Sequence, residues 1–362
     1  MHDPRTARPE ARRGAHAAAF SIIELLVVIG VISILIAVLL PALGGVRNAA
    51  RVTATTTLAN DVVNASIAFQ TDTRRLPGHF SQREVALNAE TSGFTNSENV
   101  LIDLAGGIVE PSPNNAPMAD NSFAAVGPNN INDSDLVRID NNLVGTGRSG
   151  NAYLQIKPDN LVAVQGQNNR NATADSQNNK DRTSMVDIVD YWGMPLLIYT
   201  RDEASGSQPE NFAVITSSLA ANPPAINVGL YYWESNAAYL NSERLGPNSI
   251  DVRFDLDSNR NSSMLGLDNP FLPQNLEAVL GSPSFPRFDQ ADGRVVPAAP
   301  RGGVIVISAG PSRVYYSARQ HQPGDGGGIA GQRIAYGWRT GNRLVAGEEL
   351  NGFDDIILAG GD

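Results

Sequence analysis

The chain has 362 residues, of which 42% are apolar and 18% are charged, so it is long enough for one large domain or two modest ones. It contains no cysteine, which excludes disulfides, thiolate metal sites and cysteine nucleophiles. Residues 1–19 hold four Arg and two acidic residues, a charge of +2, and the other 23 basic and 35 acidic residues give −12. Such an acidic body argues against nucleic acid as a partner, because phosphate binding needs clustered Lys and Arg. A basic head before an acidic body is typical of a protein that keeps its N-terminus cytoplasmic and exports the rest.

An uncharged apolar run occupies the 19 residues from Leu25 to Leu43. That is about the length a helix needs to cross a hydrocarbon layer of ~30 Å. Two ordinary interpretations are a signal peptide cleaved after the run, for instance beyond Gly44, and a plain signal anchor. Glu24 lies at the edge of the run, where an ionisable group raises the cost of insertion and implies a partner.

The segment from Phe20 to Ile29, FSIIELLVVI, resembles the signal of type IV prepilins and type II secretion pseudopilins. In that family a prepilin peptidase cuts before the Phe and methylates the new amine. The resemblance implies a cut between Ala19 and Phe20, although the family has Gly rather than Ala before the cut. Counted from Phe20, Glu24 is the fifth residue and Pro41 the twenty-second, the positions at which the family has its glutamate and its helix-kinking proline.

The resemblance also implies the role of Glu24, which in the family neutralises the N-terminus of a neighbouring subunit in a filament. An ammonium and a carboxylate a few ångströms apart attract by several kcal/mol even at an effective dielectric near ~20. We therefore expect Glu24→Ala to impair assembly more than folding. Pro41 removes a backbone donor, so the sequence predicts a local interruption of the helix there, which Gly44 and Gly45 loosen further.

The apolar stripe after the membrane segment predicts that the helix continues to about Thr73. It consists of Ala50, Ala54, Leu58, Val62, Ala65 and Phe69, one face of an amphipathic helix with small residues where a sheet approaches. Arg74-Arg75-Leu76-Pro77-Gly78 is a stop signal of basic residues followed by Pro and Gly.

Three short stretches of the body resemble the G-type major pseudopilins. They are Asp190 to Tyr199 (DYWGMPLLIY), Val304 to Pro311 (VIVISAGP) and Asp354 to Leu358 (DDIIL). Within the first, Gly193 and Pro195 predict a turn, Trp192 an anchor on the core, and Leu196 to Thr200 a strand. Residues 96–107 predict a short helix, and 212–216, 228–233 and 250–254 predict strands. Polar stretches at 111–122 and 165–181 predict loops.

The sequence does not single out a catalytic or metal site. Asp255 to Asn261 places oxygen ligands at alternate positions but lacks the Gly and Glu of a calcium loop. G-type pseudopilins carry calcium in a C-terminal loop, and Asp325, Asp354 and Asp355 are the candidates here. A structural calcium ion is thus possible but not predicted, and no other cofactor is predicted. Neither a His cluster nor a nucleophile elbow or phosphate loop is present, so the chain is not predicted to be an enzyme.

The expected fold class is α+β, pilin-like, with a long N-terminal helix packed on an antiparallel sheet that carries long loop insertions. The expected organisation is a cytoplasmic leader at 1–19, a transmembrane and assembly helix at 20–43, its amphipathic half at 44–76, and a periplasmic or extracellular globular domain at 77–362. The resemblance implies a single-pass inner-membrane protein that becomes a filament subunit of a type II secretion pseudopilus or a type IV pilus. Its partners would be the prepilin peptidase, other pilin or pseudopilin subunits, the inner-membrane assembly platform and the lipid bilayer. Two alternatives stay open: a surface binding or adhesion protein exported by the pilin signal, and a membrane-anchored periplasmic enzyme.

Overall fold

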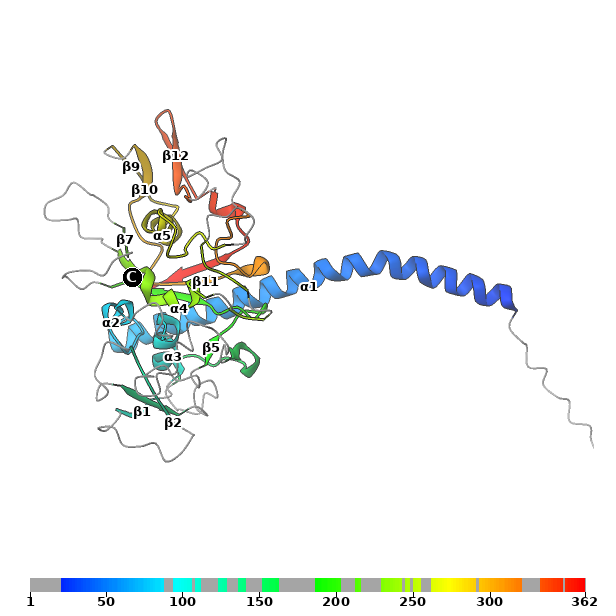
Figure 1. Cartoon of the computed structure of the whole chain (residues 1–362), viewed down its shortest axis with the longest axis horizontal. Helices are drawn as coiled ribbons and strands as arrows, with labels where there is room; N and C mark the ends of the chain where they lie inside the picture. The colour runs from blue at the N-terminus through cyan, green and yellow to red at the C-terminus, as the bar shows by residue number, and fades with distance from the viewer. Residues whose placement is uncertain are drawn as a thin grey trace, which may run out of the picture. The chain divides into compact units, whose positions relative to one another are not determined.

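The computed structural model describes residues 21–87, 94–105, 108–111, 123–128, 136–140, 152–162, 186–202, 212–215, 229–242, 245–247, 250–254, 262–290, 293–320, 333–347 and 349–361. The chain divides into two compact units, residues 1–49 and residues 50–362. The fold class is α+β, with a long N-terminal helix and antiparallel sheets, as predicted (Figure 1). The predicted loops at 165–181 lie outside the described residues, as does all but the first residue of the loop at 111–122.

The helices of the described chain begin with α1, which spans Ile22–Thr73 over 52 residues. The shorter α-helices are α2 (Gln82–Ala86), α3 (Asn96–Ala105), α4 (Ala237–Leu240) and α5 (Leu272–Leu280). Single 3₁₀ turns are η2 (Pro158–Asn160), η3 (Trp233–Asn236), η4 (Gly310–Ser312) and η6 (Glu349–Gly352). The predicted helix at 96–107 is thus confirmed as α3, with its last two residues outside the described chain.

Five antiparallel sheets are described. The central one has the order β14-β11-β6 and consists of Ile356–Gly360, Val304–Ser308 and Leu197–Thr200. A four-stranded sheet, β13-β12-β10-β9, consists of Arg343–Ala346, Gly337–Thr340, Arg294–Pro297 and Pro286–Asp289. The others are β1-β3-β2 (Ile108–Pro111, Val137–Asp140, Phe123–Val126), β4-β5 (Leu161–Val162, Asp187–Ile188) and β7-β8 (Phe212–Ile215, Gly229–Tyr232).

The helix α1 contradicts the interruption predicted at Pro41, because it runs through that residue and through Gly44 and Gly45 as one α-helix. Proline lacks one backbone donor, but a single missing hydrogen bond does not end a helix whose neighbouring turns keep theirs. The predicted end at the Arg-Arg-Leu-Pro-Gly stretch is confirmed. Thr73 is the last helical residue, and Arg74 takes the left-handed conformation with φ 63°.

In the central sheet β6 and β11 are buried on both faces and β14 is half-buried, and the register assigns alternate residues to two cores. On one face Ile198, Val306 and Leu358 lie in a row and pack with the amphipathic half of α1 and with α3. On the other face Tyr199, Ile305 and Ala359 lie in a row and pack with α4 and α5. A strand covered on both sides has a near-continuous apolar sequence, which explains the run from Val304 to Ile307 in β11.

The apolar stripe of α1 is confirmed in its C-terminal part. Leu58, Val62, Ala65 and Phe69 are buried, whereas Ala54 is half-buried and Ala50 is exposed. The helix and the central sheet approach closely at the end of β14. A Cβ atom placed on Gly360 would lie 2.5 Å from Cγ1 of Val63 on α1, so this contact requires glycine.

Two of the three other predicted strands are confirmed, as β7 and β8. The segment 250–254 was wrongly predicted as a strand: Ile250 forms an isolated bridge with Leu245, and the rest of the segment is irregular. Val252 and Phe254 are buried, so the alternation of apolar residues reflects burial and not a strand ladder. The Val252 amide instead donates to the carbonyl of Ser242 at 3.1 Å.

Candidate functional site

The N-terminal half of α1 presents apolar side chains to its surroundings along its whole described length. The exposed ones run from Ile22, 83% exposed, to Val46, 66% exposed. Among the described residues, α1 is the one helix long and apolar enough to cross a membrane. Exposing apolar surface to water is unfavourable by roughly 25 cal/mol per Å², a free-energy cost that an apolar environment such as a membrane would remove.

Glu24 lies in the first turn of α1, where it forms a capping box with Ser21. The Ser21 amide donates to Oε2 of Glu24 at 2.9 Å, and the Glu24 amide donates to Oγ of Ser21 at 3.2 Å. These reciprocal bonds satisfy two amides that no helical carbonyl reaches, and a carboxylate is favourable at a helix N-terminus. Ala19 and Phe20 lie outside the described residues, and Pro41 lies within α1.

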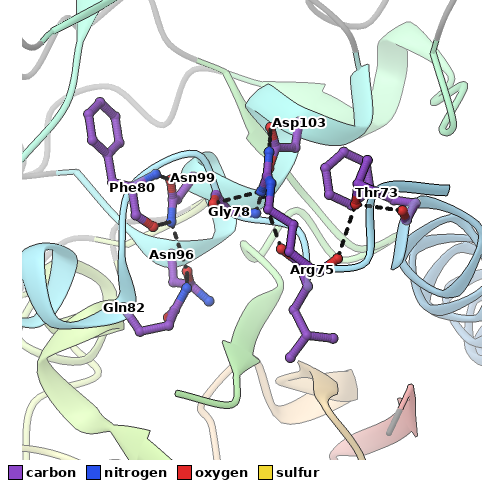
Figure 2. Close-up of polar contacts among 10 residues, drawn as sticks. Thr73, Arg75, Gly78, Phe80, Gln82, Asn96, Asn99 and Asp103 are labelled. Carbon is purple, nitrogen blue, oxygen red and sulfur yellow. Dashed lines mark hydrogen bonds and ion pairs between the residues drawn. The ribbon is translucent and has the colours of Figure 1, made fainter. Parts of the chain in front are cut away.

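The C-terminal end of α1 is tied to α3 by Arg75 (Figure 2). Nη1 and Nη2 of Arg75 donate to the two carboxylate oxygens of Asp103 at 2.6 and 3.1 Å, a bidentate pair with strong directional preference. The Gly78 amide donates to Oδ2 of Asp103 at 2.8 Å. The Arg75 guanidinium also lies 4.7 Å from the centre of the Phe69 ring. The bonds of Asp103 with Arg75 and Gly78 therefore fix the direction in which the chain leaves α1.

The opposite end of α3 continues this network to the central sheet. Figure 2 shows Asn99 facing Phe80, whose amide and carbonyl it binds at 2.8 and 2.9 Å, and Asn96 accepting from Nε2 of Gln82 at 2.8 Å.

Nδ2 of Asn96 donates to the carbonyl of Ile198 at 2.9 Å. Oγ of Ser97 donates to the carbonyl of Leu196 at 2.6 Å and accepts from the Ile198 amide at 3.1 Å. Side chains of α3 thus satisfy the edge of β6, which no neighbouring strand covers in the described chain.

The three stretches that resemble G-type pseudopilins meet at the central sheet. Two of them supply β6 and β11, and the third supplies β14. The predicted turn at Gly193 is confirmed with φ 84°, and Trp192 is buried as predicted. Oδ1 of Asp190 accepts from the amides of Trp192 and Met194 at 2.8 and 2.9 Å, and Ser308 donates to Oδ2 at 2.6 Å.

Burial raises the pKa of two acids next to the central sheet, Asp190 before β6 and Asp355 before β14. It raises the pKa of Asp190 to about 6, although the hydroxyl of Ser308 and the nearby amides favour the ionised form. Burial likewise raises the pKa of Asp355 well above its ordinary value, while the Tyr316 amide, which donates to it at 3.0 Å, opposes the shift. Asp190, Ser308 and Tyr315 are each at most 2% exposed. All three therefore lie inside the protein, where the hydroxyl of Ser308 bonds to the carboxylate of Asp190.

The calcium candidates divide between described and undescribed parts of the chain. Asp255 to Asn261 and Asp325 lie outside the described residues. Asp354 and Asp355 are described and bind backbone amides, the former that of Ser312 at 2.8 Å. Among the described residues no three His, Asp or Glu side chains converge in a way that could hold a metal ion.

Two features of the site went unrecognised in the sequence for different reasons. The capping box follows the local pattern Ser-x-x-Glu and is readable directly from Ser21 to Glu24. The pairing of Arg75 with Asp103 has no such signal, because 28 residues separate them and their meeting depends on how α3 packs.

The chain matches no protein-family model, no curated protein and no solved structure.

Proposed function

We propose that this chain is a structural subunit of a filament, a type II secretion pseudopilus or a type IV pilus-like fibre. A prepilin peptidase would cut it between Ala19 and Phe20 and methylate the new amine. The observation that carries the proposal is the position of Glu24, a carboxylate in the first turn of a helix whose following turns expose apolar side chains. A carboxylate at the end of an apolar helix requires a cationic or hydrogen-bonding partner.

The mature N-terminus would supply that partner. Before assembly, Oε2 of Glu24 accepts the Ser21 amide of its own chain, and its second oxygen can accept from another donor. In the filament that donor would be the Phe20 amine of a neighbouring subunit. At a separation of 4 Å and an effective dielectric near 20, the attraction is about 4 kcal/mol, enough to select one register between adjacent helices.

The globular body suits this role because it holds the C-terminal half of α1 firmly. The link of Arg75 to Asp103 and the contacts of Asn96 and Ser97 with β6 join the end of α1 to the central sheet. Load applied along the helix would therefore reach the sheet through short polar contacts. We propose that the fold is pilin-like in this sense: a helix for assembly, with a sheet that carries the subunit surface.

Mass spectrometry of the mature N-terminus tests the processing step. We expect N-methyl-phenylalanine at Phe20, and an unprocessed Met1 or a new terminus beyond Gly44 would contradict the proposal. Electron microscopy of cells expressing the chain with its assembly system then tests filament formation. A membrane-anchored enzyme or a plain signal anchor has no reason to be cut at this place.

Substitution of Glu24 tests the assembly step. We expect Glu24→Ala and Glu24→Gln to reduce filament yield by about tenfold or more, because both remove the negative charge, which is worth several kcal/mol in a poorly solvated pair. Ser33→Ala is the matched control. It also removes a polar group from the exposed part of α1, but Oγ of Ser33 only bonds its own helix at Ile29. Wild-type filament yield from Glu24→Gln, with normal cleavage, would contradict the charge pairing.

A further inference from the structure

Arg301 lies three residues before β11 and is bound to the end of α5. Its amide donates to the carbonyl of Leu280 at 2.9 Å, and its Nε donates to the carbonyl of Val279 at 2.7 Å. Both carbonyls belong to the last turn of α5, where no helical amide reaches them. The ordinary interpretation is that Arg301 caps this helix, since a cation is favourable at a helix C-terminus.

Capping uses only part of the Arg301 guanidinium. Its Nε carries one of the five N–H groups, and the other four, on Nη1 and Nη2, have no acceptor among the described residues. No carboxylate of the described chain forms an ion pair with Arg301, and the ionisable groups that act on it are the hydroxyls of Tyr316 and Tyr336. Arg75 differs in this respect, because both of its terminal nitrogens donate to Asp103.

The surroundings of Arg301 make a missing counter-charge costly. Arg301 is half-buried, and burial lowers the pKa of its guanidinium. Tyr316 and Tyr336 are 1% and 5% exposed, so they take the place of water beside the guanidinium without supplying a negative charge. A desolvated charge is unfavourable unless it is paired and hydrogen-bonded. An anion at Nη1 and Nη2 would remove this cost.

The nearest acid to act on this group of residues is compensated elsewhere. Glu277 acts on the hydroxyl of Tyr336, but the cations that act on its own carboxyl are three other arginines, Arg287, Arg294 and Arg333. Glu277 therefore does not neutralise Arg301.

The backbone that carries Arg301 is held in one position. A Cβ atom on the next residue, Gly302, would lie 2.8 Å from both the backbone N and the O of Gly360, so this close approach requires glycine. The hydroxyl of Tyr231 donates to the Gly302 carbonyl at 2.5 Å. A ligand therefore meets a guanidinium on a fixed backbone and loses less entropy on binding.

Tyr316 adds a second indication of a ligand. Its φ is 46°, a conformation that a bulky residue adopts only at a cost in free energy and that is frequent at ligand and catalytic sites. It is held there by Asp355, which accepts from its amide at 3.0 Å, and by Met264, whose amide donates to its carbonyl at 2.9 Å.

We propose that Arg301 binds the carboxylate of a small ligand, with Nη1 and Nη2 donating to its two oxygens and with Tyr316 and Tyr336 beside it. The planar guanidinium matches a carboxylate in a bidentate manner. One cation balances the single charge of a carboxylate, whereas a phosphate group with a charge of about −1.5 to −2 would leave a desolvated excess of negative charge. The site goes beyond the proposed function, because neither processing at Phe20 nor the pairing of Glu24 involves it.

Thermal denaturation of the full-length chain in non-ionic detergent, with sodium acetate as the probe, tests the proposal. A ligand that binds the folded state raises the melting temperature and does so saturably. We expect acetate, exchanged for chloride at pH 7 and constant sodium, to raise the melting temperature by about 2–4 °C. Sodium phosphate at the same concentrations should raise it less. An equal or larger effect of phosphate would overturn the assignment to a carboxylate.

Two variants separate this binding from the capping of α5. Arg301→Lys keeps a cation that can cap the helix but lacks the planar fork, so it should lose most of the rise caused by acetate. Arg339→Gln is the matched control: Nε of Arg339 also donates to a carbonyl, that of Gly341 at 2.7 Å, but the residue is exposed, and the rise should be that of the wild type.

The response to acetate decides the proposal. An equal rise in the wild type and in Arg301→Lys would overturn it, because the effect would then be a general one of the salt on the folded state. A wild type without a saturable rise would also overturn it. A rise lost in Arg301→Lys but kept in Arg339→Gln supports the site, even where Phe20 is not methylated and no filament forms.

Discussion

Asp190 shows how one buried carboxylate can fix a turn and make stability depend on pH. Its side chain collects the amides of Trp192 and Met194 and the hydroxyl of Ser308, and thereby joins the turn before β6 to the end of β11. Those donors favour the ionised form, but burial outweighs them and raises the pKa to about 6. The folded state thus binds this proton more tightly than the unfolded state, whose carboxyl has the ordinary value of 3.8.

The sign of the pH effect follows from that difference. A group whose folded pKa lies above its unfolded pKa stabilises most at low pH, and the contribution is lost as pH rises from about 4 through about 6. A shift of this size corresponds to about 3 kcal/mol. Asp190→Asn keeps an oxygen for the two amides but cannot titrate. Relative to the variant, we expect the wild type to lose up to about 3 kcal/mol between pH 4 and pH 7.

Urea denaturation of the full-length chain in detergent, followed by tryptophan fluorescence at both pH values, measures this difference. The chain has three Trp, and one of them, Trp192, lies two residues after the substituted Asp190. Asp159→Asn is the control, because Asp159 is exposed and should leave the pH dependence unchanged. A variant whose stability changes with pH as steeply as that of the wild type would show that Asp190 is not the titrating group.

At the scale of elements, the sequence predicted those whose signals are local. The start of α3, the strand β6 and the end of α1 at Thr73 all follow from runs of apolar residues and from nearby stop residues. The strand predicted at 250–254 is wrong, because a local signal does not show what a segment pairs with. Its alternation of apolar side chains is also a local signal, but its partners are the loop residues Ser242 and Ser263 rather than a strand.

What local signals cannot supply is the pairing of distant elements. Nothing near Asp103 in the sequence indicates Arg75 as its partner, and nothing near Asn96 indicates the edge of β6. Both contacts depend on the packing of α3 between the long helix and the central sheet. The same holds for β14, which is the last described strand and yet pairs with β11 about fifty residues before it. The spacing from Phe20 predicts the role of Glu24, whereas its bond with Ser21 follows from the local Ser-x-x-Glu pattern.

The contact of α1 with β14 depends on a glycine, which gives a prediction at this scale. A methyl group on Gly360 would lie 2.5 Å from Cγ1 of Val63 and 2.9 Å from Cδ1 of Ile67. Gly360→Ala should therefore destabilise the fold by about 1–3 kcal/mol, the usual cost of overpacking. Gly352→Ala is the matched control, since nothing lies within 4 Å of its added methyl, and it should change stability by less than about 0.5 kcal/mol.

The same urea measurement distinguishes the two glycine variants. Because Val63 provides the closest atom, Val63→Ala should recover part of the loss when combined with Gly360→Ala, a coupling that a double-mutant cycle quantifies. Equal stability of Gly360→Ala and Gly352→Ala would mean that α1 and β14 separate easily. The long helix would then be less firmly held in the body than its contacts indicate.

At the scale of the whole molecule, apolar exposure is divided sharply between the two units. Of the twenty-two exposed large apolar side chains among the described residues, seventeen lie between Ile22 and Val46. Residues 50–362 contain both large cores and the central sheet. Burial of apolar surface is the main favourable contribution to folding, so the fold is stabilised within residues 50–362, whereas most of the exposed apolar surface lies between Ile22 and Val46.

A chain that begins at Ala50 should accordingly be folded and monodisperse in buffer without detergent, while the full-length chain should require detergent. Its melting temperature should match that of the full-length chain within a few degrees, because no described core residue is removed. Size-exclusion chromatography and circular dichroism of the two chains measure this. Aggregation of the shortened chain would mean that the first 49 residues complete the fold. A full-length chain that remains soluble without detergent would mean that its apolar helix is covered by other parts of the protein, and a membrane anchor would then no longer be required to explain it.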